Sequence, residues 1–389
     1  MVARKKRFRA IGHFLKKGSK DLLKYKETDT KVPSKITRDK LRGLLEKALI
    51  TLVPVTCSIW ILSGCASINQ NISAEQITKL VFKEVWGYLL QGKEYELKGA
   101  EPFTDICYFA ANLMNDGRIT DTIARPVVAL RDGSKPKIHL VIADLWNSSL
   151  MHFSLSSVYG IRPLLINDIC RVSQDFDGVQ IDFETVSPDD AQYFWDFLQQ
   201  LRDQLPSNKM LSIAVPARTG EIFDAYEYWK IAPIMDRVVI MAYDEHWSQS
   251  SPGPVASLPW CLDVIDHALS VIENDKIVMG LPLYGRAWQD KKLAKALSFH
   301  NVQDIIAEKS AKTNYQSELG FYFEYVDKVV VKVFYDDLRS IREKLQLYAS
   351  HNVKSVAFWR IGLGPSGLWN SIENAGLENR SGIEQGKVN

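Results

Sequence analysis

Cysteine is scarce in this 389-residue chain, and the few cysteines are spaced too widely for their usual joint roles. The sequence holds five of them, and only Cys107, Cys170 and Cys261 lie beyond residue 65. These three form no CxxC pair and no metal-ligand spacing, so we expect neither a disulfide framework nor a zinc site. Internal repeats and low-complexity tracts are absent too. Because 46% of the residues are hydrophobic and 11% are aromatic, the chain can bury a sizeable core and is predicted to be globular.

A surplus of positive charge is lacking over most of the chain, although the net charge is +2. Residues 1–47 contain sixteen Lys or Arg against five Asp or Glu, a surplus of eleven, so residues 48–389 carry a net charge of −9. A nucleic-acid-binding protein needs its positive charge on the folded body. Here the positive charge precedes an apolar stretch instead, so no nucleic-acid partner is expected.

Long apolar runs are also rare, and the clearest one is short for a membrane span. It covers residues 48–62 (ALITLVPVTCSIWIL) and directly follows the basic segment. A spanning helix needs about 20 apolar residues, whereas an export signal has a shorter apolar core behind a basic segment. We therefore predict an export signal, with an uncleaved signal anchor as the alternative.

The apolar run ends in Leu62-Ser63-Gly64-Cys65, which resembles a bacterial lipobox. By that resemblance, Cys65 becomes the lipidated first residue of an exported, membrane-anchored lipoprotein of the cell envelope. Residues 1–64 are then a basic tail plus export signal, residues 65–79 a short linker, and residues 376–389 a polar C-terminal tail.

Between these ends, short β-rich apolar runs alternate with helical patterns, which is typical of parallel βα units. Eight such runs predict a closed (β/α)8 TIM barrel of the α/β class over residues 80–375. The expected strands are residues 85–89, 105–110, 138–143, 179–183, 211–215, 238–242, 277–280 and 355–359.

The clearest predicted helix follows the fourth of these strands. Ser187 is its expected N-cap and Pro188 its first helical residue, ahead of the amphipathic run AQYFWDFLQQLRDQL. Further helices are predicted over residues 262–272 and 338–349. A strand that leads directly into such a helix forms a βα unit, as a TIM barrel requires.

The connection between the seventh and eighth strands, residues 281–354, is much too long for one helix and two loops. Within it, the runs GFYFEY and VVVKVFY flank Val326-Asp327-Lys328, which indicates a hairpin. The preceding run VQDIIAEKSA has a helical pattern. We therefore expect a small α+β insertion between strands 7 and 8, at about residues 281–335.

The strongest chemical signal is the segment Asp177-Gly178-Val179-Gln180-Ile181-Asp182-Phe183-Glu184, in which polar and apolar residues alternate. In a strand, alternation sends side chains to opposite faces. Gln180, Asp182 and Glu184 therefore share one face, and the apolar residues face the helical shell. Charged side chains inside a barrel are costly, so they predict a site at its C-terminal mouth. A structural ion network is the alternative.

This segment closely resembles the D-G-x-D-x-D-x-E signature that family 18 glycosidases carry on the fourth barrel strand. It matches at Asp177, Gly178, Asp182 and Glu184 and departs at Gln180, where the commonest pattern has Asp. Some peptidoglycan-acting relatives have Asn at this place. The departure removes a negative charge beside Asp182, so proton cycling between two carboxyl groups must work differently here.

Three further segments resemble motifs of the family in the expected order, so the likeness covers roughly residues 80–372. The third strand departs, because Val141–Trp146 stands in place of the family's Ser-x-Gly-Gly type pattern. The matching segments are Met241-Ala242-Tyr243-Asp244 after the sixth strand, Gly280-Leu281-Pro282-Leu283-Tyr284-Gly285-Arg286 after the seventh, and Ala357-Phe358-Trp359 in the eighth.

The resemblance implies a glycoside hydrolase in which the substrate's own acetamido oxygen attacks the anomeric carbon. Glu184 is then the catalytic acid, Asp182 orients the acetamido group and stabilises the oxazolinium intermediate, and Tyr243 bonds the acetamido oxygen. No cofactor or metal is implied. The implied substrate contacts are Gln180, Asp177, Met241, Asp244, Tyr284, Arg286 and Trp359, the last as an apolar floor under the sugar.

Peptidoglycan, chitin and N-glycans all contain the β-linked N-acetylglucosamine that this mechanism requires. The export signal, the lipobox and the likeness to Asn-bearing cell-wall relatives favour peptidoglycan as the polysaccharide partner of a monomeric enzyme. Two other functions stay open at this point. One is a non-catalytic saccharide-binding envelope lipoprotein, and the other is an envelope assembly factor that uses the barrel as a scaffold.

Overall fold

The computed structural model describes residues 79–374, apart from residues 120–122, 131–132, 290–293 and 328. The predicted basic tail, export signal, lipobox with Cys65 and C-terminal tail therefore lie outside the described residues. None of the helices in the described part is both long enough and apolar enough to cross a membrane.

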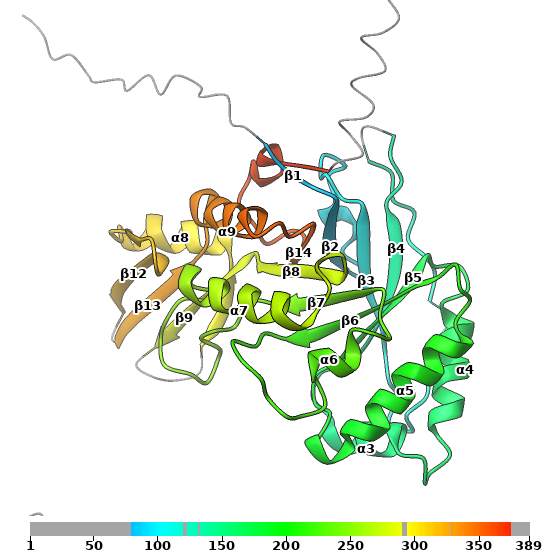
Figure 1. Cartoon of the computed structure of the whole chain (residues 1–389). Helices are drawn as coiled ribbons and strands as arrows, with labels where there is room; N and C mark the ends of the chain where they lie inside the picture. The colour runs from blue at the N-terminus through cyan, green and yellow to red at the C-terminus, as the bar shows by residue number, and fades with distance from the viewer. Residues whose placement is uncertain (1–78, 120–122, 131–132, 290–293, 328, 375–389) are drawn as a thin grey trace, which may run out of the picture. The chain divides into compact units, whose positions relative to one another are not determined.

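Eight parallel strands close into a barrel in the order β14-β2-β3-β4-β5-β6-β7-β8 (Figure 1). Each predicted strand overlaps an observed one, and the prediction of a (β/α)8 TIM barrel is confirmed. The barrel strands are β2 (Glu84–Leu90), β3 (Asp105–Asn112), β4 (Lys137–Asp144), β5 (Gly178–Phe183), β6 (Met210–Pro216), β7 (Arg237–Met241), β8 (Ile277–Pro282) and β14 (Ser355–Trp359).

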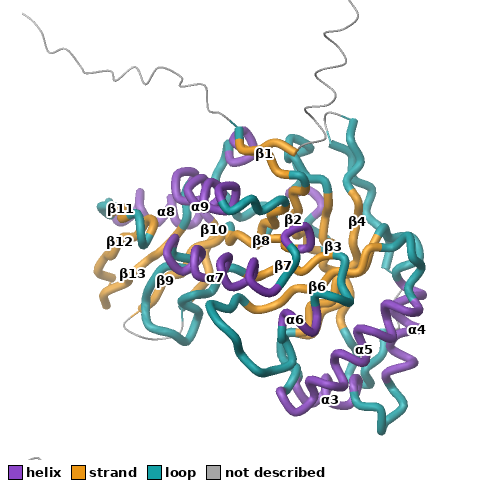
Figure 2. Tube along the Cα trace, viewed as in Figure 1, coloured by secondary structure: helices purple, strands orange, loops and turns teal. Residues whose placement is uncertain are grey.

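Helices lie outside the strands and cover the barrel from β4 onward (Figure 2). The described residues that follow β2 and β3 contain no α-helix, and only a 3-10 turn, η1 (Glu94–Glu96), stands after β2. A short pair of parallel strands, β1 (Leu80–Phe82) and β15 (Ile372–Asn374), joins the two ends of the described chain. The helices that pack on the barrel are α3 (Ser148–Leu155), α4 (Arg162–Val172), α5 (Ala191–Gln204), α6 (Tyr228–Ile231), α7 (Leu258–Val271) and α9 (Leu338–Ser350).

Helix α5 begins three residues later than the sequence predicts. Ser187 does accept a hydrogen bond from the backbone N–H of Asp189, but the turn that it starts, η2 (Pro188–Asp190), is a 3-10 turn. Asp190, which precedes the α-helix, does not cap it because its carboxylate bonds Nδ1 of His152 at 2.7 Å. The helix is then held by its buried face, which contains Phe194, Phe197, Leu198 and Leu201 at helical spacing.

Strand alternation divides the core into two layers. In β2, Val85 and Leu89 pack in the large cluster that includes the helices, while Trp86 and Tyr88 pack in a smaller cluster with residues of other strands. A closed barrel has this arrangement because successive side chains point outward and inward. The inner cluster consists of Trp86, Tyr88, Cys107, Val141, Ala143, Val239, Val278 and Ala357.

Polar groups occupy the N-terminal end of the barrel interior. The Glu84 carboxylate accepts hydrogen bonds from Nε of Arg237 at 2.9 Å, from Nε1 of Trp86 at 3.1 Å and from the Ser355 hydroxyl at 3.2 Å. Burial acts to raise the pKa of Glu84, but the Arg237 guanidinium and these hydrogen bonds outweigh it and lower the pKa. Every carboxylate oxygen here has a partner, so this end of the barrel is a structural network that ties β2, β7 and β14 together.

The predicted α+β insertion lies between β8 and α9. Its sheet has the antiparallel order β10-β9-β13-β12-β11, and β12 and β13 form the predicted hairpin, whose Lys328 lies outside the described residues. The helix α8 (Phe299–Lys309) packs on this sheet around its own small core. The strands are β9 (Tyr284–Gln289), β10 (Lys295–Ser298), β11 (Asn314–Gln316), β12 (Gly320–Asp327) and β13 (Val329–Tyr335).

Gly178, the first residue of β5, allows neighbouring strands to approach closely. A Cβ atom at this position would lie 2.3 Å from Nδ1 of His139 and 2.7 Å from the Met210 carbonyl oxygen. His139 cannot move aside, because its ring stacks on Trp86 and its Nε2 bonds Asp105 at 2.9 Å. Replacing Gly178 by Ala should therefore lower the free energy of unfolding by about 1–3 kcal/mol, as overpacking does in other cores.

Urea denaturation of the Gly178→Ala variant measures this loss. Gly220→Ala is the matched control, because a Cβ atom there meets nothing within 4 Å, and its stability should stay within about 0.5 kcal/mol of the wild type. Equal stabilities of the two variants would show that the contact between β4, β5 and β6 is looser than described.

Candidate active site

Two carboxyl groups lie at the C-terminal end of β5 on the inward face. Asp182 is 3% exposed, and its Oδ1 atom bonds no described residue. Glu184 stands two residues later, beyond the strand, and its side chain opens to solvent in the cavity. Alternation therefore places one carboxyl group inside the barrel and the next at its mouth.

Neighbouring elements hold the end of β5 and the residues just after it from both sides. The backbone N–H of Glu184 donates to the Asp144 carbonyl at 3.0 Å, which extends the pairing of β5 with β4. The Tyr226 hydroxyl donates to the Phe183 carbonyl at 2.6 Å and accepts the N–H of Val186 at 3.0 Å. Glu184 is thus placed by backbone hydrogen bonds before and after it, which limits its movement in the mouth.

The end of β7 brings Met241, Tyr243 and Asp244 to the same cavity. The Tyr243 ring fits there because β8 has a glycine beside it: a Cβ atom at Gly280 would lie 3.1 Å from the ring and 2.7 Å from the Ile240 carbonyl. Burial, together with nearby acidic groups, raises the pKa of Tyr243 well above its usual value. Its hydroxyl is therefore a neutral hydrogen-bond donor.

Asp244 is the centre of a second cluster of polar side chains. Its backbone is left-handed (φ 62°), and its carboxylate accepts the Tyr284 hydroxyl at 2.6 Å. Arg286 donates to the same carboxylate through Nε at 2.9 Å and through Nη2 at 2.6 and 2.8 Å. Tyr284 and Arg286 belong to β9, so the first strand of the insertion completes this cluster of polar side chains.

Aromatic rings form another wall of the cavity. Trp359, at the end of β14, has its ring 5.1 Å from that of Tyr88 and 5.5 Å from that of Phe109, both edge to face. Trp359 and Tyr88 also line the cavity. A flat ring held in this way can pack against the C–H face of a sugar.

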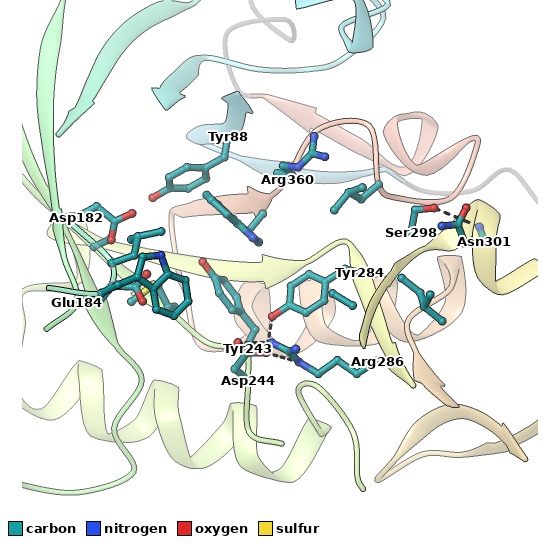
Figure 3. A pocket seen from close by; sticks show the side chains of 18 residues that line it. Tyr88, Asp182, Glu184, Tyr243, Asp244, Tyr284, Arg286, Ser298, Asn301 and Arg360 are labelled. Atoms are coloured by element: carbon teal, nitrogen blue, oxygen red, sulfur yellow. Dashed lines mark hydrogen bonds and ion pairs between the residues drawn. The ribbon is translucent and has the colours of Figure 1, made fainter. Parts of the chain in front are cut away.

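The cavity at the mouth has a volume of about 580 Å³ and extends from the β5 carboxyl groups toward the insertion (Figure 3). Asp182 and Glu184 lie at one end of the labelled side chains, and Ser298 and Asn301, next to and within α8, lie at the other. Such a volume suits a ligand larger than one sugar ring. Its lining residues are Tyr88, Leu145, Trp146, Asp182, Glu184, Ala214, Met241, Tyr243, Asp244, Tyr284, Arg286, Ala296, Leu297, Ser298, Asn301, Trp359, Arg360 and Leu363.

The two β5 carboxyl groups both bind protons more tightly than usual. Burial and the Glu184 charge raise the pKa of Asp182 from 3.8 to about 8. Loss of hydration in the cavity and the Asp244 charge raise the pKa of Glu184. Asp182 is itself protonated at neutral pH, so Asp244 is the charge that acts on Glu184.

Two predicted substrate contacts do not reach the cavity. Asp177 precedes β5 at the opposite end of the barrel, where its carboxylate accepts the Ile138 N–H at 2.8 Å and contacts Arg125. Gln180 is fully buried one inward position below Asp182, and its amide donates to the Ser212 hydroxyl at 3.4 Å. Both predictions of direct sugar contact are therefore wrong, because the signature runs the full length of the strand and only its last part lies at the mouth.

Other lining residues escaped the sequence analysis. Tyr88 follows Trp86 on the inward face of β2, so its alternation near the end of a barrel strand could have revealed it. Trp146 stands after β4, where the family pattern is lost. Arg360 directly follows Trp359 at the C-terminal end of β14, so its place after a barrel strand could have revealed it. Ser298 and Asn301 carry no sequence signal of this kind, since the packing of the insertion brings them to the cavity.

The part of the chain that the structure describes contains no group of three or more His, Cys, Asp and Glu side chains that could hold a metal ion. The cavity residues offer an acid carboxyl group, a buried protonated carboxyl group, neutral tyrosine hydroxyls and a charge-paired arginine. These groups can donate protons and hydrogen bonds to a ligand.

Comparison with known proteins decides the family. Residues 102–364 match the model of the family described as glycosyl hydrolases family 18. The chain belongs to this family. Its barrel also resembles the crystal structure of the spore cortex-lytic enzyme SleL of Bacillus cereus, with a TM-score of 0.66 and 25% identity over 77% of this chain and 76% of that chain. A chitinase from Chromobacterium violaceum has the same fold, with a TM-score of 0.66 and 22% identity over 75% of this chain and 98% of that chain.

Curated relatives of this family 18 chain include two Bacillus proteins. It is 33% identical over 242 residues to a Bacillus subtilis (strain 168) protein named as a sporulation-specific glycosylase, covering 57% of this chain and 58% of that protein. It is 28% identical over 289 residues to the cortical fragment-lytic enzyme of Bacillus cereus, covering 68% of this chain and 66% of that protein. The chain thus spans less than two thirds of the length of these relatives.

Replacing Asp182 by Asn should stabilise this family 18 barrel. The folded state keeps the Asp182 proton up to about pH 8, whereas the unfolded state loses it near pH 3.8. The folded state therefore binds more protons in this interval, so the free energy of unfolding falls as pH rises through it. Asn has no proton to lose, and the variant should be more stable than the wild type by at least about 1 kcal/mol at neutral pH.

Urea denaturation at about pH 5 and about pH 8 measures this effect. The difference between the variant and the wild type should grow with pH. Identical pH dependence of the two proteins would show that Asp182 ionises normally in the folded state.

Proposed function

We propose that this chain is a glycoside hydrolase that cleaves β-linked N-acetylglucosamine in peptidoglycan or a chitin-like polysaccharide, with retention of configuration. The observation that carries the proposal is the position of Glu184. Its carboxyl group, whose pKa is raised, opens into the cavity two residues beyond the buried Asp182. The Tyr243 hydroxyl group and the Trp359 ring line the same cavity.

In the first step, the acetamido oxygen of the sugar would attack its own anomeric carbon while the bond to the leaving oxygen breaks. Glu184 would give its proton to that oxygen. Tyr243 would donate a hydrogen bond to the acetamido oxygen. Asp182 would accept the acetamido N–H through the carbonyl oxygen of its protonated carboxyl group, which would help to stabilise the positive charge on the oxazolinium ring.

In the second step, a water molecule would attack the anomeric carbon from the side that the leaving group vacated, and the bond from that carbon to the acetamido oxygen would break. Glu184, now a carboxylate, would take the proton of that water and return to its acid form. Trp359 would support the sugar ring throughout. The configuration at the anomeric carbon would be retained, because each step inverts it once.

A non-catalytic saccharide-binding protein is the second candidate. The observation in its favour is Gln180, which stands where the commonest signature has Asp and cannot share a proton with Asp182. Glu184 weighs against it, because a purely binding site has no need of an exposed carboxyl group whose proton affinity is raised. Turnover decides between the two.

For the cell, we propose an exported enzyme held at the membrane of the envelope through Cys65 or through an uncleaved signal anchor. The support is the basic tail, the apolar run and the lipobox-like sequence at residues 62–65. An anchored, monomeric hydrolase would meet peptidoglycan directly. Radiolabelled palmitate incorporation, compared between the wild type and Cys65→Ala, tests the lipid anchor.

Replacing Glu184 by Gln should abolish turnover without loss of the fold. Removal of a general acid costs about 100-fold or more in kcat, whereas saccharide affinity should change little because Gln keeps the shape of the side chain. The measurement is release of reducing sugar from purified peptidoglycan and from chitin oligosaccharides by the full chain. Binding of either polymer without turnover by the wild type would move the saccharide-binding function to first place.

Replacing Asp244 by Asn should move the pH profile of kcat/KM. Glu184 must be protonated to act, so activity falls as pH rises through its pKa. The Asp244 charge raises that pKa, and its removal should shift the alkaline limb to lower pH. Asn tolerates the left-handed backbone of position 244. An unmoved limb, or one shifted to higher pH, would contradict the assignment of Glu184 as the acid.

A further inference from the structure

Two arginine side chains line the cavity, and they differ in what their donors bind. Arg286 donates hydrogen bonds from both Nε and Nη2 to the Asp244 carboxylate. Arg360 lies across the cavity from Asp244 and Arg286 in the view of Figure 3. Within the described part of the chain, Arg360 donates to Oε2 of Glu96 at 2.6 Å and to the Ile361 carbonyl at 3.2 Å, and both hydrogen bonds come from Nη1. The Nε and Nη2 edge of Arg360 is therefore left for a ligand.

The Arg360 guanidinium is held in place by a partner that is itself fitted closely. The side chains of Arg360 and Glu96 are only 18% and 16% exposed. Glu96 lies against Gly362, where a Cβ atom would come within 2.3 Å of Oε2. Gly362 also has φ +88°, a conformation that suits glycine. A side chain at position 362 would therefore displace Glu96.

A guanidinium edge with two parallel donors selects a particular kind of ligand. It has no acceptor, so it suits carboxylate and carbonyl oxygens rather than hydroxyl groups that must also donate. Chitin offers hydroxyl groups at O3 of every sugar. In peptidoglycan, every second sugar carries at O3 a lactyl group, whose acceptor oxygens are a free carboxylate or, where a peptide is attached, an amide carbonyl.

We propose that Arg360, positioned by Glu96, is a specificity-determining residue that binds the lactyl group of N-acetylmuramic acid. This inference rests on the proposed function, because it selects peptidoglycan among the polymers that the cavity residues could cleave. Arg360 is not assigned a part in bond cleavage. It discriminates between glycans because the lactyl-bearing sugar adds an acceptor at O3 to the acetamido carbonyl group that both polymers share.

The test measures binding in the full chain with Glu184→Gln, so that no substrate is consumed. Calorimetry gives Kd for a tetrasaccharide of alternating N-acetylglucosamine and N-acetylmuramic acid, for its peptide-bearing form and for chitotetraose. Replacing Arg360 by Gln in this background should lower the ratio of muramic tetrasaccharide affinity to chitotetraose affinity at least about fivefold, as loss of a charged hydrogen bond does. Comparison of the first two ligands shows whether carboxylate or amide carbonyl is bound.

Two further variants separate specificity from folding. Glu96→Gln should lower the same ratio by a smaller factor, because Arg360 loses its positioning partner while keeping its own donors. Arg339→Gln is the matched control: Arg339 is 61% exposed, is absent from the cavity lining and pairs with Glu343, so the ratio should stay unchanged. Thermal unfolding of each variant reports its fold.

If Arg360→Gln lowers the affinity for the muramic tetrasaccharide and for chitotetraose equally, or lowers neither, the proposal for Arg360 is overturned. Turnover of peptidoglycan by the wild type would still support the proposed function in that case. Failure of the Glu184→Gln protein to bind any of the three glycans would overturn both the specificity of Arg360 and the proposed saccharide function.

Discussion

Asp182 and Glu184 share one face of a strand whose other face packs against the helical shell, and most features of the mouth follow from the need to accommodate them. A closed parallel barrel forces alternate side chains into an interior filled by aromatic and aliphatic groups. A carboxyl group placed there without an ionic partner keeps its proton. The second carboxyl group, one pleat further along, reaches the open cavity. The same alternation therefore creates a buried protonated group and an accessible acid.

The two ends of the barrel illustrate how environment decides the state of a carboxyl group. Glu84, at the N-terminal end, is largely buried but has Arg237, Trp86 and Ser355 as partners, and its pKa is lowered. Asp182 has no such charged partner among the described residues, and its pKa is raised. The paired carboxylate at the N-terminal end stabilises the barrel, whereas the carboxyl groups at the C-terminal end are the reactive ones. The insertion contributes to the second end, since it brings Arg286 to Asp244 and extends the cavity away from Glu184.

Much of this arrangement is readable from the sequence because it depends on local periodicity. The eight strands, the inward direction of Asp182 and Glu184, and the motifs that end in Tyr243 and Trp359 all follow from alternation and order along the chain. Alternation does not reveal depth, which is why Asp177 and Gln180 were predicted at the mouth and lie below it. Ser298 and Asn301 reach the cavity through the packing of the insertion, which leaves no periodic signal. The late start of α5 depends on a single contact between Asp190 and His152.

The central claim is that Asp182 holds a proton at neutral pH while Glu184 faces the cavity above it. Infrared difference spectroscopy of the wild type against Asp182→Asn, followed through a pH titration, measures this most directly. The account predicts a protonated carboxyl band at neutral pH that the variant lacks and that disappears near the pKa of about 8. A band that is already absent at mildly acidic pH would show that Asp182 is ionised in the resting protein and would contradict the account.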